Sequence, residues 1–134
     1  MAELFDFWND HSETFLKMAY LYDRHKVVEH PDGYGTKTGD CGDTITLYLL
    51  VEDGCVDQVF FDLQGCLNTN ACCNALADLV EGKKLAECWE VTPEDIIGYL
   101  ETLPDDHHHC AELTVGTFYL ALTSYAAKQE KIRC

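Results

Sequence analysis

Residues 44–63, TITLYLLVEDGCVDQVFFDL, decide the fold, because apolar and polar positions alternate on both sides of a turn signal. The dipeptide Asp53-Gly54 between the two runs is typical of a β-hairpin. Matching the two apolar faces pairs Ile45 with Leu63, Leu47 with Phe61 and Leu49 with Val59. The stretch therefore predicts two antiparallel strands joined by a three-residue or bulged turn over residues 53–55.

The open end of this hairpin is flanked by two cysteines. Extended backward, the register places Cys41 opposite position 67, one residue from Cys66, so the two would lie roughly 5 to 8 Å apart if the pairing persists. Cys66 also precedes a predicted helix, and Cys110 falls in the first turns of another, where the helix dipole and free amides favour a thiolate. Because thiolates bind metals, the sequence predicts that Cys41, Cys66 and Cys110 share a metal site.

Two harder donors accompany these cysteines. Asp43 follows Cys41 by two residues and His109 precedes Cys110, which adds an oxygen and a nitrogen donor. The alternatives are that Asp43 is a loop or capping carboxylate, that His109 is solvated, and that the cysteines pack as small hydrophobic residues. Three sulfurs with one exchangeable harder ligand would suit a protein that releases what it binds. Cys72 fits the apolar face of a helix and is expected in the core, whereas the role of Cys73 is open.

The remaining segments predict helices around the hairpin. A first helix is expected after a cap at Asp10, followed by a loop over residues 29–43 with a short edge strand near residues 34–38. Further helices are expected over residues 72–82, from Thr92-Pro93 to a stop at Pro104, and from a cap at Asp105 or Asp106 toward the carboxyl terminus. This order predicts an α+β fold, a small antiparallel sheet of about three strands packed by helices, in one domain over residues 1–134.

Composition narrows the class of function. Of 134 residues, 24 are acidic and 9 are basic, and the resulting net charge of −15 disfavours nucleic acid and anionic membranes as partners. The amino terminus has no basic stretch followed by an apolar run, and no segment approaches the roughly 18 apolar residues of a membrane span. We therefore expect a cytoplasmic protein, and in that reducing compartment eight cysteines indicate metal or redox chemistry.

Several short motifs, taken in order, resemble the NifU/IscU-type iron-sulfur scaffold proteins. They are Cys41-Gly42-Asp43 before the hairpin, Gly65-Cys66 after it and His109-Cys110 at the last helix, supported by Ser12-Glu13, Glu81-Gly82-Lys83 and Leu103-Pro104. The resemblance implies an IscU/SufE-like fold, a transient [2Fe-2S] cluster and delivery of sulfur by a cysteine desulfurase. It also implies that Cys41, Cys66 and Cys110 are cluster ligands, that Asp43 or His109 completes the site, and that Cys110 is a candidate persulfide acceptor.

The sequence departs from this family pattern at four places. The usual Asn-Pro before the first loop is His30-Pro31, and residues 103–107 read LPDDH where bacterial housekeeping members carry a leucine, two prolines, valine and lysine for chaperone recognition. Residues 67–73, LNTNACC, replace a run of small residues and add two thiols. The insertion typical of the zinc-dependent branch, between Cys66 and Cys110, is absent. Chaperone-driven release is therefore in doubt, and the zinc enzyme is disfavoured.

Three hypotheses follow. The first is a non-enzymatic scaffold or carrier that assembles a cluster and passes it to apo iron-sulfur proteins. The alternative is a persulfide acceptor working with a cysteine desulfurase, in which Zn²⁺ is held by Cys41, Asp43, Cys66 and Cys110. The third is an interaction module with a structural zinc site, disfavoured because Asp43 and His109 leave the shell open to exchange. The sequence leaves open whether the chain forms a homo-oligomer.

Overall fold

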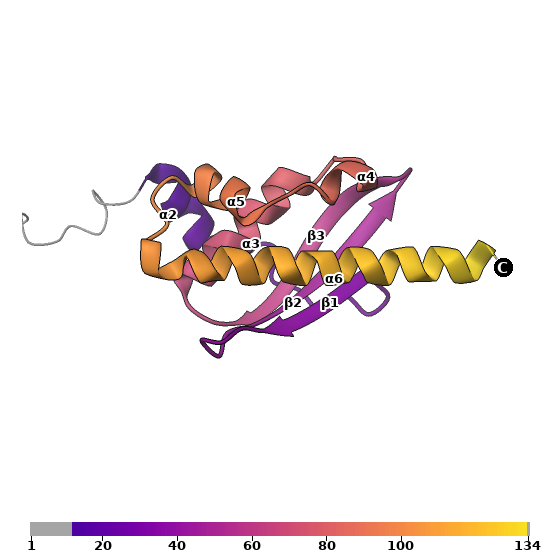
Figure 1. The fold of residues 1–134 in the computed structure, drawn as a ribbon, viewed down its shortest axis with the longest axis horizontal. Coiled ribbons are helices and arrows are strands. Elements are labelled where there is room, and N and C mark those ends of the chain that lie inside the picture. Colours follow the sequence, from indigo (N-terminus) through magenta and orange to yellow (C-terminus); the bar gives the residue numbers. More distant parts are fainter. Residues whose placement is uncertain (1–11, 134) are drawn as a thin grey trace, which may run out of the picture.

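A three-stranded antiparallel sheet forms the centre of the computed structural model, which describes residues 12–133 (Figure 1). The strands are β1 (Gly33–Thr38), β2 (Thr44–Glu52) and β3 (Cys55–Gln64), and they lie side by side in the order β1-β2-β3. The predicted hairpin and the edge strand before it are therefore confirmed. No helix within the described range is long and apolar enough to cross a membrane.

The register of β2 and β3 is the one that the apolar pattern predicts. Ile45 pairs with Leu63, Leu47 with Phe61 and Leu49 with Val59. The turn itself is not bulged as predicted, because Asp53 and Gly54 form a two-residue turn with φ values of 55° and 78°. The register then shifts between Leu50 and Val51, so the bulge lies within the strands and not at residues 53–55.

Helices cover the apolar face of the sheet, and their bounds follow the sequence signals with some differences. The elements are α2 (Glu13–Ala19), α3 (Leu67–Val80), α4 (Leu85–Cys88), α5 (Pro93–Leu100), the 3₁₀ turn η1 (Asp105–His107) and α6 (His108–Arg133). The predicted α+β class, a small antiparallel sheet packed by helices, is confirmed. The short α4 and η1 were not predicted, because three or four residues give no readable periodicity.

The ends of three helices differ from the predictions. Ser12 caps α2 through its hydroxyl, which accepts from the Phe15 amide at 3.0 Å, and Asp10 lies outside the described residues. Helix α5 ends at Leu100, because Glu101 takes a φ of 66°, so Pro104 is not its stop. Asp105 and Asp106 lie inside η1 and do not cap α6 directly.

The long helix α6 packs against β1 at close range and crosses the sheet (Figure 1). Gly33 and Gly35 make this approach feasible, since a Cβ atom on either would lie 2.6 Å from a backbone oxygen of α6. Helix α3 packs against both α6 and β3. The amino-terminal ends of α3 and α6 are thereby brought to the end of the sheet where β2 begins and β3 ends.

Candidate metal centre

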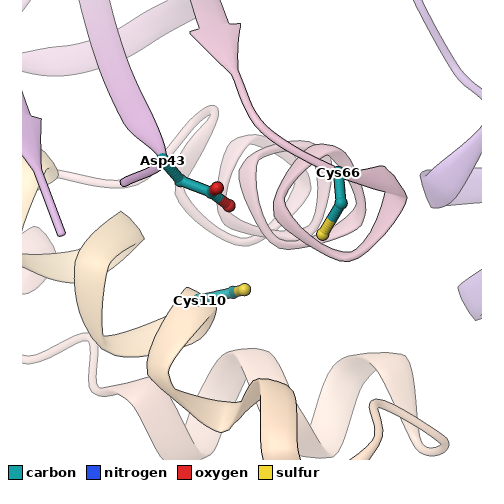
Figure 2. Close-up of side chains that lie close together, drawn as sticks. All are labelled: Asp43, Cys66 and Cys110. Atoms are coloured by element: carbon teal, nitrogen blue, oxygen red, sulfur yellow. The ribbon is translucent and has the colours of Figure 1, made fainter. Parts of the chain in front are cut away.

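Three ligand atoms converge at this end of the sheet. Asp43 immediately precedes β2, Cys66 immediately precedes α3, and Cys110 lies in the first turn of α6. A carboxylate oxygen of Asp43 and the two Sγ atoms lie within 4.8 Å of one another. Figure 2 shows the three side chains approaching from three elements and pointing into a common space. We call Asp43, Cys66 and Cys110 the metal-ligand set.

A tight turn before β2 sets the position of Asp43. The Gly39 amide donates to the Asp43 carbonyl oxygen at 2.9 Å, and the Gly42 amide donates to the Gly39 carbonyl oxygen at 3.0 Å. Gly42 has a φ of 93°, a conformation that side chains rarely tolerate, and this explains the glycine between Cys41 and Asp43. The half-buried Asp43 is thereby directed inward while Cys41 stays on the exposed part of the turn.

Cys66 is the N-cap residue of α3, and its surroundings favour the thiolate. Its carbonyl oxygen accepts from the amides of Thr69 and Asn70, each at 3.1 Å. Partial burial alone would raise the pKa of the Cys66 thiol, but hydrogen bonds from the backbone and side chains of Thr69 and Asn68 outweigh it and lower the pKa. The lowered pKa of Cys66 agrees in direction with the prediction that a helix start favours the thiolate.

Cys110 behaves differently, although it also lies in a first helical turn. Its side chain is 1% exposed, and burial raises the pKa of the thiol to about 11. A hydrogen bond from Thr69 opposes this shift, whereas the charges of Cys66, Asp43 and Cys41 add to it. The prediction of a favoured thiolate is therefore wrong for Cys110. A cation bound to the metal-ligand set would compete with the proton and stabilise the thiolate.

Cys41 and His109 lie near the metal-ligand set but are not part of it. Strand pairing ends at Thr44 and Gln64, so the register does not extend to Cys41, and its sulfur lies outside the 4.8 Å group. Both residues line a surface hollow of about 540 Å³ together with residues 37–40, Glu112 and Leu113. The exposed His109 has its Nε2 atom 3.7 Å from the Cys110 sulfur. Neither residue belongs to the group whose ligand atoms all lie within 4.8 Å of one another.

Two further cysteines lie behind the metal-ligand set on α3. Cys72 and Cys73 are 0% exposed, and burial is the largest cause of the raised pKa of both thiols, which reaches about 12 for Cys73. The core position predicted for Cys72 is confirmed, and Cys73 shares it. Both are expected to remain protonated, packed thiols.

Thr69 is the residue near the ligands that sequence reasoning missed. Its side chain is fully buried, and its hydroxyl oxygen lies near the donor atoms of all three members of the metal-ligand set. The available signal is its position three residues after the N-cap Cys66, where the helix turns a side chain back toward the cap. Nothing in the sequence alone places Asp43 beside that turn.

Comparison with known proteins identifies chains that are similar to this one. Residues 24–132 match the family described as NifU-like N terminal domain. The chain is 29% identical over 106 residues to the iron-sulfur cluster assembly scaffold protein IscU 1 of Archaeoglobus fulgidus, covering 78% of this chain and 69% of that protein. It is 30% identical over 110 residues to the scaffold protein IscU of Aquifex aeolicus, covering 79% and 69%.

A solved structure shows that the fold also matches. The amino-terminal part of a nitrogen-fixing NifU-like protein from Brucella abortus superposes with a TM-score of 0.72, at 20% identity, over 92% of this chain and 99% of that one. At this identity the likeness concerns the fold alone. The fold of this chain is thus one that a solved structure also has.

Proposed function

The chain belongs to the family of NifU-like N-terminal domains, and from this we propose that it is an iron-sulfur cluster assembly scaffold. It would hold a cluster on Cys41, Cys66 and Cys110, with Asp43 or His109 completing the site, and pass the cluster to apo-proteins. The observation that carries the proposal is the convergence of Asp43 and two cysteine sulfurs within 4.8 Å. The names of the Archaeoglobus and Aquifex relatives support the same function.

The chemistry of the donors suits iron and sulfide as cargo. Cysteine thiolates are the usual ligands of iron-sulfur clusters, and a single oxygen or nitrogen ligand leaves one position easier to exchange. Cys110 is buried whereas Cys66 and Cys41 are exposed, so a cluster held between them would have one side against the protein and another open to solvent. We propose a [2Fe-2S] cluster, bound transiently and released through the open side.

A protein that assembles and releases a cluster needs partners that supply sulfur and accept the cluster. We propose that a cysteine desulfurase supplies the sulfur and that apo iron-sulfur proteins receive the cluster. Cysteines 41, 55, 66, 72, 73, 88 and 110 all carry free thiols, which fits a reducing compartment such as the cytoplasm. We propose no enzymatic activity for the scaffold itself. Two copies bridged by one cluster would form a homo-oligomer only while loaded.

A zinc-bound sulfur relay is the second candidate, and the composition of the metal-ligand set favours it. Tetrahedral zinc with bonds of about 2.0 to 2.3 Å holds its ligand atoms roughly 3.5 Å apart. The three ligand atoms lie within 4.8 Å, so adjustments of about an ångström would allow them to bind zinc. Cys110 would then accept a persulfide sulfur while zinc keeps the thiolates in place.

Anaerobic reconstitution tests both candidates. The protein would be incubated with iron, sulfide and a cysteine desulfurase and followed by visible absorption and metal analysis. The scaffold predicts sulfur-to-iron charge-transfer bands, about two irons per cluster, and transfer to an apo-ferredoxin. A colourless protein that keeps one zinc per chain and gains a persulfide on Cys110 would instead favour the relay.

Variants assign the ligands in the same experiment. We expect Cys41→Ala and Cys66→Ala to abolish cluster retention without changing the fold, since both side chains are exposed. Cys55→Ala is the matched control, because Cys55 begins β3 at the far end of the strand from the metal-ligand set. Normal loading of Cys41→Ala or Cys66→Ala would overturn the assignment of that cysteine.

A further inference from the structure

The side chain of Thr69 lies between all three members of the metal-ligand set. Its Oγ1 atom is 2.5 Å from Asp43 Oδ2, 3.5 Å from Cys110 Sγ and 3.8 Å from Cys66 Sγ. The residue is 0% exposed, so this hydroxyl is a buried polar group whose surroundings in the protein must satisfy it. No other described side chain is hydrogen-bonded to all three residues of the set.

The hydrogen bond to Asp43 is the shortest of the three contacts that the Thr69 hydroxyl makes. A threonine hydroxyl has a single hydrogen to donate, and a carboxylate can only accept. At 2.5 Å the Asp43 oxygen is much the nearest acceptor, and a hydrogen bond to an ionised oxygen is stronger than one to a neutral thiol. The two sulfur atoms, at 3.5 and 3.8 Å, are the weaker partners of the same hydroxyl.

The backbone fixes Thr69 where this bond requires it. Its amide donates to the Cys66 carbonyl oxygen at 3.1 Å in the first turn of α3. Gly65 lies close to the same oxygen, because a Cβ atom on Gly65 would lie 2.8 Å from Asp43 Oδ2 and 3.2 Å from the Thr69 Cβ atom. Asp43 Oδ2 is thus in close contact with both residue 65 and Thr69, which restricts rotation of the carboxylate.

We propose that Thr69 is a positioning residue for metal and cluster binding, which acts by holding the Asp43 carboxylate in the orientation that faces Cys66 and Cys110. The proposal rests on the function proposed above and adds to it a residue that is not itself a ligand. Residues that orient metal ligands through hydrogen bonds commonly contribute about 10- to 100-fold to affinity. Among the residues that the structure describes, Thr69 donates the side-chain hydrogen bond that reaches the oxygen ligand.

Cobalt provides the test, because Co²⁺ accepts the same donors as zinc and iron and its visible spectrum reports the number and kind of ligands. The reduced full chain would be titrated anaerobically with Co²⁺ alone. Thr69→Val keeps the shape of the side chain and removes the hydroxyl, and Thr69→Ser restores it. Thr117→Val is the matched control, since Thr117 is also 0% exposed but donates to the Leu113 carbonyl of its own helix.

We expect Thr69→Val to weaken Co²⁺ binding about 10-fold and to alter the ligand-field bands, because the oxygen ligand is no longer held in place. Thr69→Ser and Thr117→Val should bind within twofold of the unmodified chain, with unchanged spectra. If Thr69→Val does not fold, as judged by circular dichroism, Thr69→Ala takes its place with the same expectation.

The outcomes separate this proposal from the function on which it rests. If the unmodified chain binds no Co²⁺, the metal-ligand set itself is wrong and the scaffold proposal fails with it. If the unmodified chain binds and the hydroxyl-free variant binds equally well with the same spectrum, only the role of Thr69 is overturned. If Thr69→Ser lost as much Co²⁺ affinity as Thr69→Val, the role of Thr69 would also be overturned, since side-chain packing and not the hydroxyl would then explain the loss.

Discussion

The carboxylate of Asp43 lies against the backbone of Gly65, at a distance that leaves no room for a side chain on residue 65. A Cβ atom there would stand 2.8 Å from Oδ2 and 3.0 Å from the carboxyl carbon. Gly65 is not among the glycines with positive φ in the described chain, so its backbone would tolerate an L-residue. The glycine that precedes Cys66 is therefore explained by its neighbour Asp43 and not by the conformation of the chain.

Gly65→Ala should consequently displace Asp43. We expect Co²⁺ affinity to fall about 10-fold, because the new methyl group displaces the Asp43 carboxylate. We also expect the free energy of unfolding to fall by about 1 kcal/mol. Cobalt titration and urea unfolding measure the two effects. The control is Gly98→Ala, where a Cβ atom meets nothing within 4 Å and the residue lies inside α5. It should stabilise the chain by about 0.5 kcal/mol and leave Co²⁺ binding unchanged.

A second prediction concerns the order in which the thiols react. Cys66 is exposed and its pKa is lowered, whereas Cys110 is buried with a pKa of about 11. Since the thiolate is the reactive form, Cys66 should be alkylated by iodoacetamide at pH 7.5 well before Cys110. The rate at Cys66 should also level off at a lower pH than that of an ordinary thiol. Mass spectrometry of peptides after timed quenching measures both.

Zinc protection extends this experiment to Cys41. One equivalent of Zn²⁺ should slow alkylation of Cys66, and of Cys41 as well if its turn closes onto the metal. Cys55, partly exposed at the other hairpin end, should react at the same rate with and without Zn²⁺. Continued fast reaction of Cys41 beside a protected Cys66 would remove Cys41 from the ligands.

The parts of this fold that the sequence predicted are those set by short-range patterns. Alternating apolar residues on both sides of Asp53-Gly54 leave one register for β2 and β3, and the structure has it. The positions of Cys66 and Cys110 at helix starts follow from equally local signals. The end of α5 was misplaced because Glu101 leaves the helix in a positive-φ conformation that its residue type does not indicate.

The parts that could not be predicted depend on the meeting of distant segments. The strand register was extended to Cys41, but the chain turns away at Gly42, and no pairing pattern reports such a turn. Burial reversed the effect expected from the start of α6 on Cys110, because the depth of a side chain depends on every element around it. Thr69 was overlooked since its partner Asp43 lies 26 positions away.

A third prediction addresses what fixes α2 on α3 beside the site. The side-chain amide of the buried Asn70 donates to the carbonyl oxygens of Ala19 at 2.8 Å and Leu21 at 3.0 Å, where α2 ends. Asn70→Ala removes this donor from the Ala19 carbonyl, while Asn74 still donates to that of Leu21, so we expect a loss of about 2 kcal/mol in the free energy of unfolding. Urea unfolding measures it. Asn68→Ala, on the same helix but more exposed, should cost less than about 0.5 kcal/mol, and equal losses would contradict this account.

The last prediction concerns release of the cargo, where Asp43 has a role distinct from that of the cysteines. An oxygen ligand binds iron less firmly than a thiolate and is the position at which an incoming ligand would enter. Asp43→Ala should therefore slow transfer of a reconstituted cluster to an apo-ferredoxin severalfold, as followed by visible circular dichroism of the acceptor. His109→Ala is the matched comparison, because His109 offers the other hard donor, 3.7 Å from Cys110 Sγ. Transfer that is unchanged in Asp43→Ala but slowed in His109→Ala would assign the labile position to the histidine.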